Sequence, residues 1–169
     1  MKILVRVDAY PDIALGHLNR CVNLGISLRE CGHSVTFLSY NDSATQEILS
    51  KTRFEYKLIP FKINDKQSKC EELSQLEVLS DSIDLLLVDS YNVDQSYFDF
   101  LNNCFPMIGY LDDLGLDFDV DFVINPSCKV TESDYTAKKV LCGLQYVILG
   151  GEYRVGRVKV FSTKKISIL

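Results

Sequence analysis

The sequence predicts an α/β protein: a parallel β-sheet with helices on both faces. Short aliphatic and β-branched runs alternate along the chain with longer amphipathic segments. The strongest run, at 83–90 (IDLLLVDS), is continuously apolar at its centre, which is typical of a strand buried on both faces. Strands that alternate with helices at this pitch indicate βαβ units. The chain has 169 residues, which is enough for one domain with a substantial core.

The individual elements follow from the same patterns. The first strand is expected at 2–8 (KILVRVD) and the first helix at 17–31, with Gly32 just after its end. Further strands are expected at 34–40, 54–60, 83–90, 105–113, 121–126 and 144–150, and further helices at 43–51, 66–80 and 94–103.

Composition and charge exclude several classes of protein. Hydrophobic residues make up 47% and charged residues 24%, and the net charge is −5 without a Lys/Arg cluster, so we expect no nucleic-acid partner. No apolar run approaches the ~18 residues of a membrane span. Arg6 and Asp8 interrupt the first apolar run, so this run does not fit a signal peptide. We therefore expect a cytoplasmic protein without membrane contact. The six cysteines form no CxxC pair and are expected to be buried thiols, with no zinc site.

Three polar segments follow predicted strands, at 8–20 (DAYPDIALGHLNR), 89–92 (DSYN) and 110–115 (YLDDLG). Ligands of open parallel sheets bind beyond the carboxyl ends of the strands. The sequence therefore predicts that these segments meet at one rim of the sheet and form a site.

His17 is the candidate catalytic residue of this rim. Gly16 would let the backbone approach a ligand, and a helix N-terminus favours the neutral imidazole that a general base needs. Asp8 or Asp12 would then hold the other ring nitrogen. Arg20, one turn further along the same side of the helix, is expected to meet a carboxylate or a phosphate.

Structural roles remain open for each candidate. A lone histidine at a helix start is often a capping or solvated residue, and Tyr91 is often a packing residue after a buried strand. Asp112 and Asp113 would equally cap a turn before Gly115. His33 is expected at the opposite rim, without a functional role. The sequence contains no GxGxxG fingerprint, P-loop, nucleophile elbow or HExxH metal pair.

The ordered segments resemble the N-terminal domain of the UDP-sugar hydrolases of pseudaminic acid synthesis (the PseG type). The resemblance begins with R-x-D, I-x-x-G-H-x-x-R-C and L-x-x-x-G-H-x-V-T-F, and it covers nearly the whole chain. The residues that carry these first motifs are Arg6, Asp8, Ile13, Gly16, His17, Arg20, Cys21, Leu28, Gly32, His33, Val35, Thr36 and Phe37. It continues through LLLVDSYNVD, YLDDLG, VINPSCKVTESDY and CGLQYVILGGEYR.

The resemblance implies a Rossmann-like domain that forms the N-terminal half of a glycosyltransferase-B-like fold, related to the lipid-II-forming glucosaminyltransferase. It implies hydrolysis of a UDP-linked 2,4-diacetamido-2,4,6-trideoxy sugar, with no metal or other cofactor. His17 would orient or deprotonate the attacking water and Tyr91 would place the water or the sugar. The implied substrate-binding residues are Asp8, Gly16, Arg20, Asp89, Ser90 and Asp113.

Two departures and the C-terminus qualify this interpretation. Ala14 stands where the family usually has glycine, and Ser90 where it commonly has histidine, so a different sugar or weaker activity is expected. We expect the sugar-site domain at 1–155, then at 156–169 a linker and the start of a UDP-binding domain that is missing or separate. The alternatives are a glycosyltransferase of the same architecture and a non-catalytic half that docks a nucleotide-binding subunit.

Overall fold

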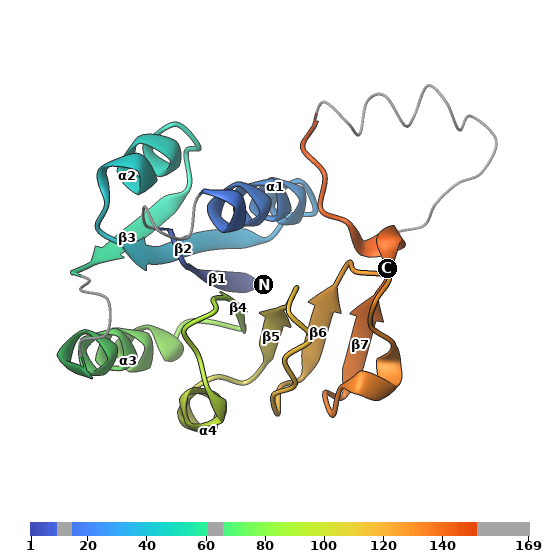
Figure 1. Ribbon diagram of the computed structural model, residues 1–169. Helices are drawn as coiled ribbons and strands as arrows, with labels where there is room; N and C mark the ends of the chain where they lie inside the picture. The colour runs from blue at the N-terminus through green and yellow to red at the C-terminus, as the bar shows by residue number, and fades with distance from the viewer. Residues whose placement is uncertain (10–14, 61–65, 152–169) are drawn as a thin grey trace.

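A computed structural model, shown in Figure 1, describes residues 1–9, 15–60 and 66–151. All strand pairs in the single seven-stranded sheet are parallel, and the strand order is β3-β2-β1-β4-β5-β6-β7. The strands are β1 (Lys2–Val7), β2 (Ser34–Tyr40), β3 (Glu55–Ile59), β4 (Leu85–Asp89), β5 (Ile108–Leu111), β6 (Phe122–Asn125) and β7 (Lys139–Cys142). The predicted fold class is confirmed.

Helices α1 and α2 cover one face of the sheet, and α3 and α4 cover the other (Figure 1). The helices are α1 (Gly16–Glu30), α2 (Ser43–Ser50), α3 (Lys66–Ser80) and α4 (Gln95–Cys104), with short 3₁₀ helices η1 (Glu132–Asp134) and η2 (Leu144–Tyr146). One apolar core lies on each face: Leu18 and Phe37 belong to the first, and Phe98 and Tyr110 to the second. Burial on both faces explains why β4 is apolar throughout its centre.

Local sequence signals define most helix ends. The Asp42 and Asp94 side chains accept backbone N–H groups at the starts of α2 and α4. Gly32, with φ of +86°, follows the end of α1, and the His33 N–H returns to the Leu28 carbonyl. His33 lies at the amino end of β2, where its Nδ1 is 3.4 Å from the N-terminal nitrogen. It is therefore remote from the carboxyl rim, as predicted.

The last predicted strand, at 144–150, is wrong. The seventh strand is instead β7, directly before it, and Leu144–Tyr146 form η2. Gly143 adopts φ of +102°, a conformation that ends the extended backbone, and the Leu144 side chain is 64% exposed. The apolar residues of this segment therefore do not form a buried strand. The predicted domain boundary near 155 lies outside the described residues.

The prediction that the cysteines are buried is also mostly wrong. Cys21 is buried, whereas Cys31, Cys70 and Cys128 are exposed. Within the described residues no helix is long and apolar enough to cross a membrane. The same residues contain no group of three or more His, Cys, Asp or Glu side chains that could hold a metal ion.

Candidate active site at the carboxyl rim

The topology brings the predicted site segments together. Strands β1, β4 and β5 are neighbours, so the residues that follow them meet at one carboxyl rim. Helix α1, which follows β1, adds two side chains one turn apart, His17 and Arg20. Asp89 ends β4, and Asp113 follows β5. The predicted convergence at this rim is confirmed.

His17 is oriented by a buried carboxylate. Its Nδ1 hydrogen-bonds Asp89 Oδ1, whereas Arg20 Nη2 is 3.2 Å from the same nitrogen. Because Asp89 is the closer partner and accepts only, we assign the ring proton to Nδ1. The Nε2 atom then carries the lone pair, and no hydrogen bond to it is formed by the described residues. The partner of His17 is thus Asp89 and not Asp8; Asp12 lies outside the described residues.

Asp89 is the centre of the site. It is fully buried and accepts hydrogen bonds from His17, from Arg20 Nε at 2.6 Å and Nη2 at 2.6 Å, and from Cys21 Sγ at 3.1 Å. Burial raises the pKa of Asp89, but the hydrogen bonds from Arg20 and His17 outweigh it and lower the pKa below its ordinary value. Asp89 is therefore an ionised anchor at neutral pH.

Cys21 is a supporting residue whose role sequence reasoning missed. Burial, and then the charge of Asp89, raise the pKa of the thiol well above its ordinary value. The protonated thiol donates to Asp89 and is not a nucleophile. The sequence signal was its place four residues after His17, on the same helix side, in the GHxxRC motif.

Arg20 bridges two carboxylates. Besides the two bonds to Asp89, its Nη1 donates to Asp113 Oδ2 at 2.8 Å. The guanidinium is partly exposed, with 21% of its side-chain surface accessible. Of the two expected partners, a carboxylate or a phosphate, the structure shows carboxylates. With two acids around one arginine, this part of the rim favours a neutral ligand group over a phosphate.

Tyr91 covers the imidazole. Its ring meets the His17 ring edge-on, with centroids 4.4 Å apart and an interplanar angle of 86°. Burial, followed by a hydrogen bond with Asp113, raises the pKa of Tyr91 to about 12. At neutral pH the phenol is therefore a hydrogen-bond donor beside the candidate base.

The adjacent acids Asp112 and Asp113 have separate roles. Asp112 is buried, and its carboxylate accepts the N–H groups of Leu114, Gly115 and Leu116. It caps the turn after β5, as the structural alternative predicted. Only Asp113 joins the Arg20 cluster.

Asp8 and Ser90 lie beneath the rim. Both are buried, with 0% and 1% of their surface exposed, and Ser90 Oγ donates to Asp8 Oδ2 at 2.7 Å. The Arg6 guanidinium pairs with the other Asp8 oxygen. The structure gives both side chains protein partners, and direct sugar contact by Asp8 and Ser90 stays a prediction.

Gly16 gives a test of ligand approach. Among the described residues, a Cβ added at Gly16 would meet no heavy atom within 4 Å outside its chain neighbours and its own helix backbone, so these residues do not require glycine there for packing. We expect Gly16→Ala to change the free energy of unfolding by less than about 0.5 kcal/mol, while weakening substrate binding, because the methyl group would occupy open space beside His17. Urea unfolding and KM in the natural protein would check this. An unchanged KM contradicts the expected close approach of a ligand.

A small hollow of about 110 Å³ adjoins the cluster. Arg20 and Asp112 are the charged residues of its lining, and the other lining residues are apolar. The apolar lining residues are Leu111, Ile124, Pro126, Val147 and Ile148. This hollow extends the site from Arg20 toward the ends of β5 and β6.

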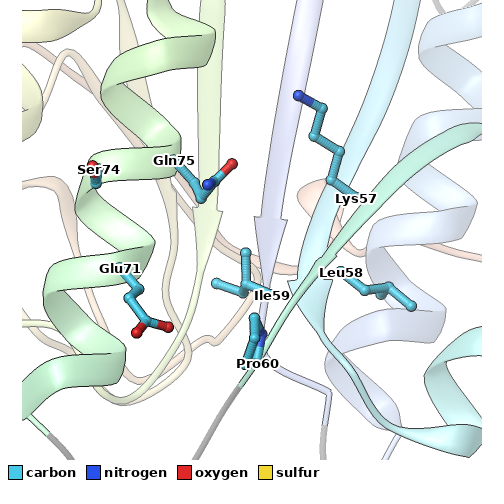
Figure 2. Close-up of a pocket in the computed structure, with 7 residues that line it drawn as sticks. All are labelled: Lys57, Leu58, Ile59, Pro60, Glu71, Ser74 and Gln75. Atoms are coloured by element: carbon cyan, nitrogen blue, oxygen red, sulfur yellow. The ribbon is translucent and has the colours of Figure 1, made fainter.

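A larger hollow of about 560 Å³ lies between β3 and α3 (Figure 2). Figure 2 shows Glu71 and Gln75 of α3 extending toward Ile59 and Pro60 at the end of β3. The other lining residues are Lys57, Leu58 and Ser74. None of the predicted site residues lines this hollow, because β2 and β1 separate β3 from β4 in the sheet.

Comparisons with known proteins agree with the fold. No family model and no curated protein sequence matches the chain. The structure of MurG from Acinetobacter baumannii is similar, with a TM-score of 0.63, 8% identity and 84% of this chain covered. A glycosyltransferase from Rickettsia africae ESF-5 has a TM-score of 0.59, 12% identity and 97% of this chain covered. The chain spans about half the length of these proteins, 45% and 50% respectively.

At these identities the likeness shows the fold alone: a glycosyltransferase-B-like half, built on a Rossmann-type parallel sheet. The finer resemblance to the PseG-type hydrolases finds no support in these comparisons. The activity therefore has to be argued from the site.

Proposed function

We propose that the chain is one half of an enzyme that acts on a nucleotide-linked sugar, and that His17 is its general base. The buried pair of His17 and Asp89 is the observation that carries this proposal. A base must be held in one tautomer and orientation, with its free nitrogen toward the reactant. Asp89 provides the orientation and would stabilise the imidazolium that forms when Nε2 takes a proton.

In the proposed reaction, Nε2 removes a proton from a hydroxyl group as its oxygen attacks the anomeric carbon of the sugar. The bond from that carbon to the phosphate oxygen breaks, and the nucleoside diphosphate leaves with the bonding electrons. A good leaving group needs mainly a positioned nucleophile and a base within reach. Tyr91 would donate a hydrogen bond to the nucleophile or to the sugar beside His17.

The nucleophile defines two candidate activities. Transfer to an acceptor hydroxyl is favoured by the two glycosyltransferase-B-like neighbours, one of which is described as a glycosyltransferase. Hydrolysis, with water as the nucleophile and a UDP-linked 2,4-diacetamido-2,4,6-trideoxy sugar as substrate, is favoured by the sequence resemblance. The chain spans about half of each neighbour, so we propose that UDP binds mainly to a second half, on the same chain or a separate one.

Product analysis of the full-length natural protein separates the two activities. The protein would be incubated with that UDP-sugar in ¹⁸O-labelled water, with and without a mixture of sugar acceptors. Free sugar carrying ¹⁸O, together with UDP, supports hydrolysis, and a new glycoside supports transfer. If this substrate yields no UDP under any of these conditions, the proposal is contradicted for this sugar.

A further inference from the structure

We infer that Ser90 is a positioning residue, which holds Tyr91 against the His17 imidazole, and that buried Asp8 anchors Ser90. This assigns both residues a role other than sugar contact. The catalytic consequence of this inference rests on the proposed function, whereas the geometric part does not.

The placement of Tyr91 needs an explanation, because 38% of its surface is exposed. Its ring nevertheless meets the His17 ring in a defined edge-on geometry, with centroids 4.4 Å apart. A half-exposed side chain in the β4–α4 loop is not enclosed by core packing. Its position therefore depends on two supports, the hydrogen bond with Asp113 and the loop backbone.

Ser90 holds that backbone on both sides of Tyr91. Its Oγ accepts the N–H of Asn92 at 3.0 Å, and its own carbonyl accepts the Tyr110 hydroxyl at 3.2 Å. The same Oγ donates to Asp8 Oδ2 at 2.7 Å. The Ser90 hydroxyl thus ties the residue after Tyr91 to Asp8, whereas the bond from Tyr110 is made to the Ser90 backbone.

Asp8 is itself rigidly placed. It has no exposed surface, and the Arg6 guanidinium pairs with its second oxygen. Arg6 is fixed in turn by Glu72 of α3, through bonds of 2.7 Å from Nε and 2.9 Å from Nη2. The bonds therefore continue from a core helix to the loop that carries Tyr91, and rigid support of this kind is what keeps a site residue in register.

Nuclear magnetic resonance of the 169-residue chain tests the inference without any substrate. In the wild type we expect a nuclear Overhauser effect between the Tyr91 and His17 rings and slow exchange of the Asn92 amide hydrogen. Ser90→Ala should weaken the ring-to-ring effect and speed Asn92 exchange by about tenfold or more, because the Oγ acceptor is gone. Ser90→Thr, which keeps the hydroxyl, should restore both signals.

Ser39→Ala is the matched control. Ser39 is equally buried, and its Oγ also makes a single donated bond, to the Val7 carbonyl at 2.9 Å. The Ser39→Ala substitution should leave the ring-to-ring effect and the Asn92 exchange rate at wild-type levels. The inference is overturned if Ser90→Ala keeps both signals. It is equally overturned if the Asn92 amide exchanges without protection in the wild type, a measurement that needs no folded variant.

In the full-length protein, Ser90→Ala should lower kcat by roughly ten- to a hundredfold with little change in KM, because a misplaced Tyr91 affects the reacting geometry. Absence of turnover in the wild type would contradict the proposed function and leave the resonance result standing. Loss of the resonance signals without a fall in kcat would remove Ser90 from the positioning role.

Discussion

His17→Asn in the full-length protein is expected to lower kcat by roughly 10²–10⁴-fold, the usual contribution of a general base. Asparagine is chosen because its side-chain N–H can replace the Nδ1–H that Asp89 accepts, so the buried carboxylate keeps a donor. The fold should therefore remain intact, while the proton acceptor at the Nε2 position is lost. Steady-state UDP release measures the effect, and circular dichroism confirms folding.

The second histidine provides the control for this experiment. The chain contains two histidines, and His33 lies at the amino end of β2, at the opposite rim from the site. His33→Asn should leave kcat within about twofold of wild type, since a surface substitution away from the site has little effect. A loss below tenfold for His17→Asn would remove His17 from the catalytic role.

Glu72→Ala is expected to cost about 3 kcal/mol of the free energy of unfolding, at the low end of the range for breaking a buried ion pair. Glu72 lies in the core with Arg6 and accepts the hydroxyls of Tyr40 and Tyr97, each at 2.6 Å. The loss is at the low end because Asp8 remains to pair with Arg6. Urea unfolding at neutral pH measures it.

The same glutamate predicts a pH dependence. Burial raises the pKa of Glu72, but the Arg6 charge and the hydrogen bonds from Arg6, Tyr40 and Tyr97 outweigh it and lower the pKa below the ordinary 4.5. Because its pKa is lower in the folded state, ionised Glu72 contributes its full stabilisation above pH 4.5. This contribution is lost as the pH falls through the folded-state pKa. The difference in free energy of unfolding between the wild type and Glu72→Ala should therefore become smaller at acidic pH.

Glu77→Ala on the same helix is the control, because Glu77 is exposed. It should change the free energy of unfolding by no more than about 0.5 kcal/mol at neutral pH. Equal effects of Glu72→Ala and Glu77→Ala would show that the buried network contributes nothing particular to stability.

Most of the fold was predictable because its signals are local. Apolar runs of strand length, the helix start at Asp94 and Gly32 after α1 act within a few residues, and the structure confirms these positions. The prediction failed at 144–150, where an apolar segment follows a glycine with positive φ and stays partly exposed. A short run of apolar residues does not by itself distinguish a buried strand from an exposed turn.

By itself the sequence indicated the parallel sheet and the gathering of His17, Arg20 and Tyr91 at its carboxyl rim, because each of these residues follows the end of a predicted strand. The strand order, which sets β1 beside β4, came from the tertiary structure. Only the tertiary structure decided which groups pair. Asp89 is 72 residues from His17, and Glu72 is 66 residues from Arg6. No local sequence pattern specifies pairs that are so far apart along the chain. The pairing of buried charges depends on which side chains the packed core places within hydrogen-bonding distance.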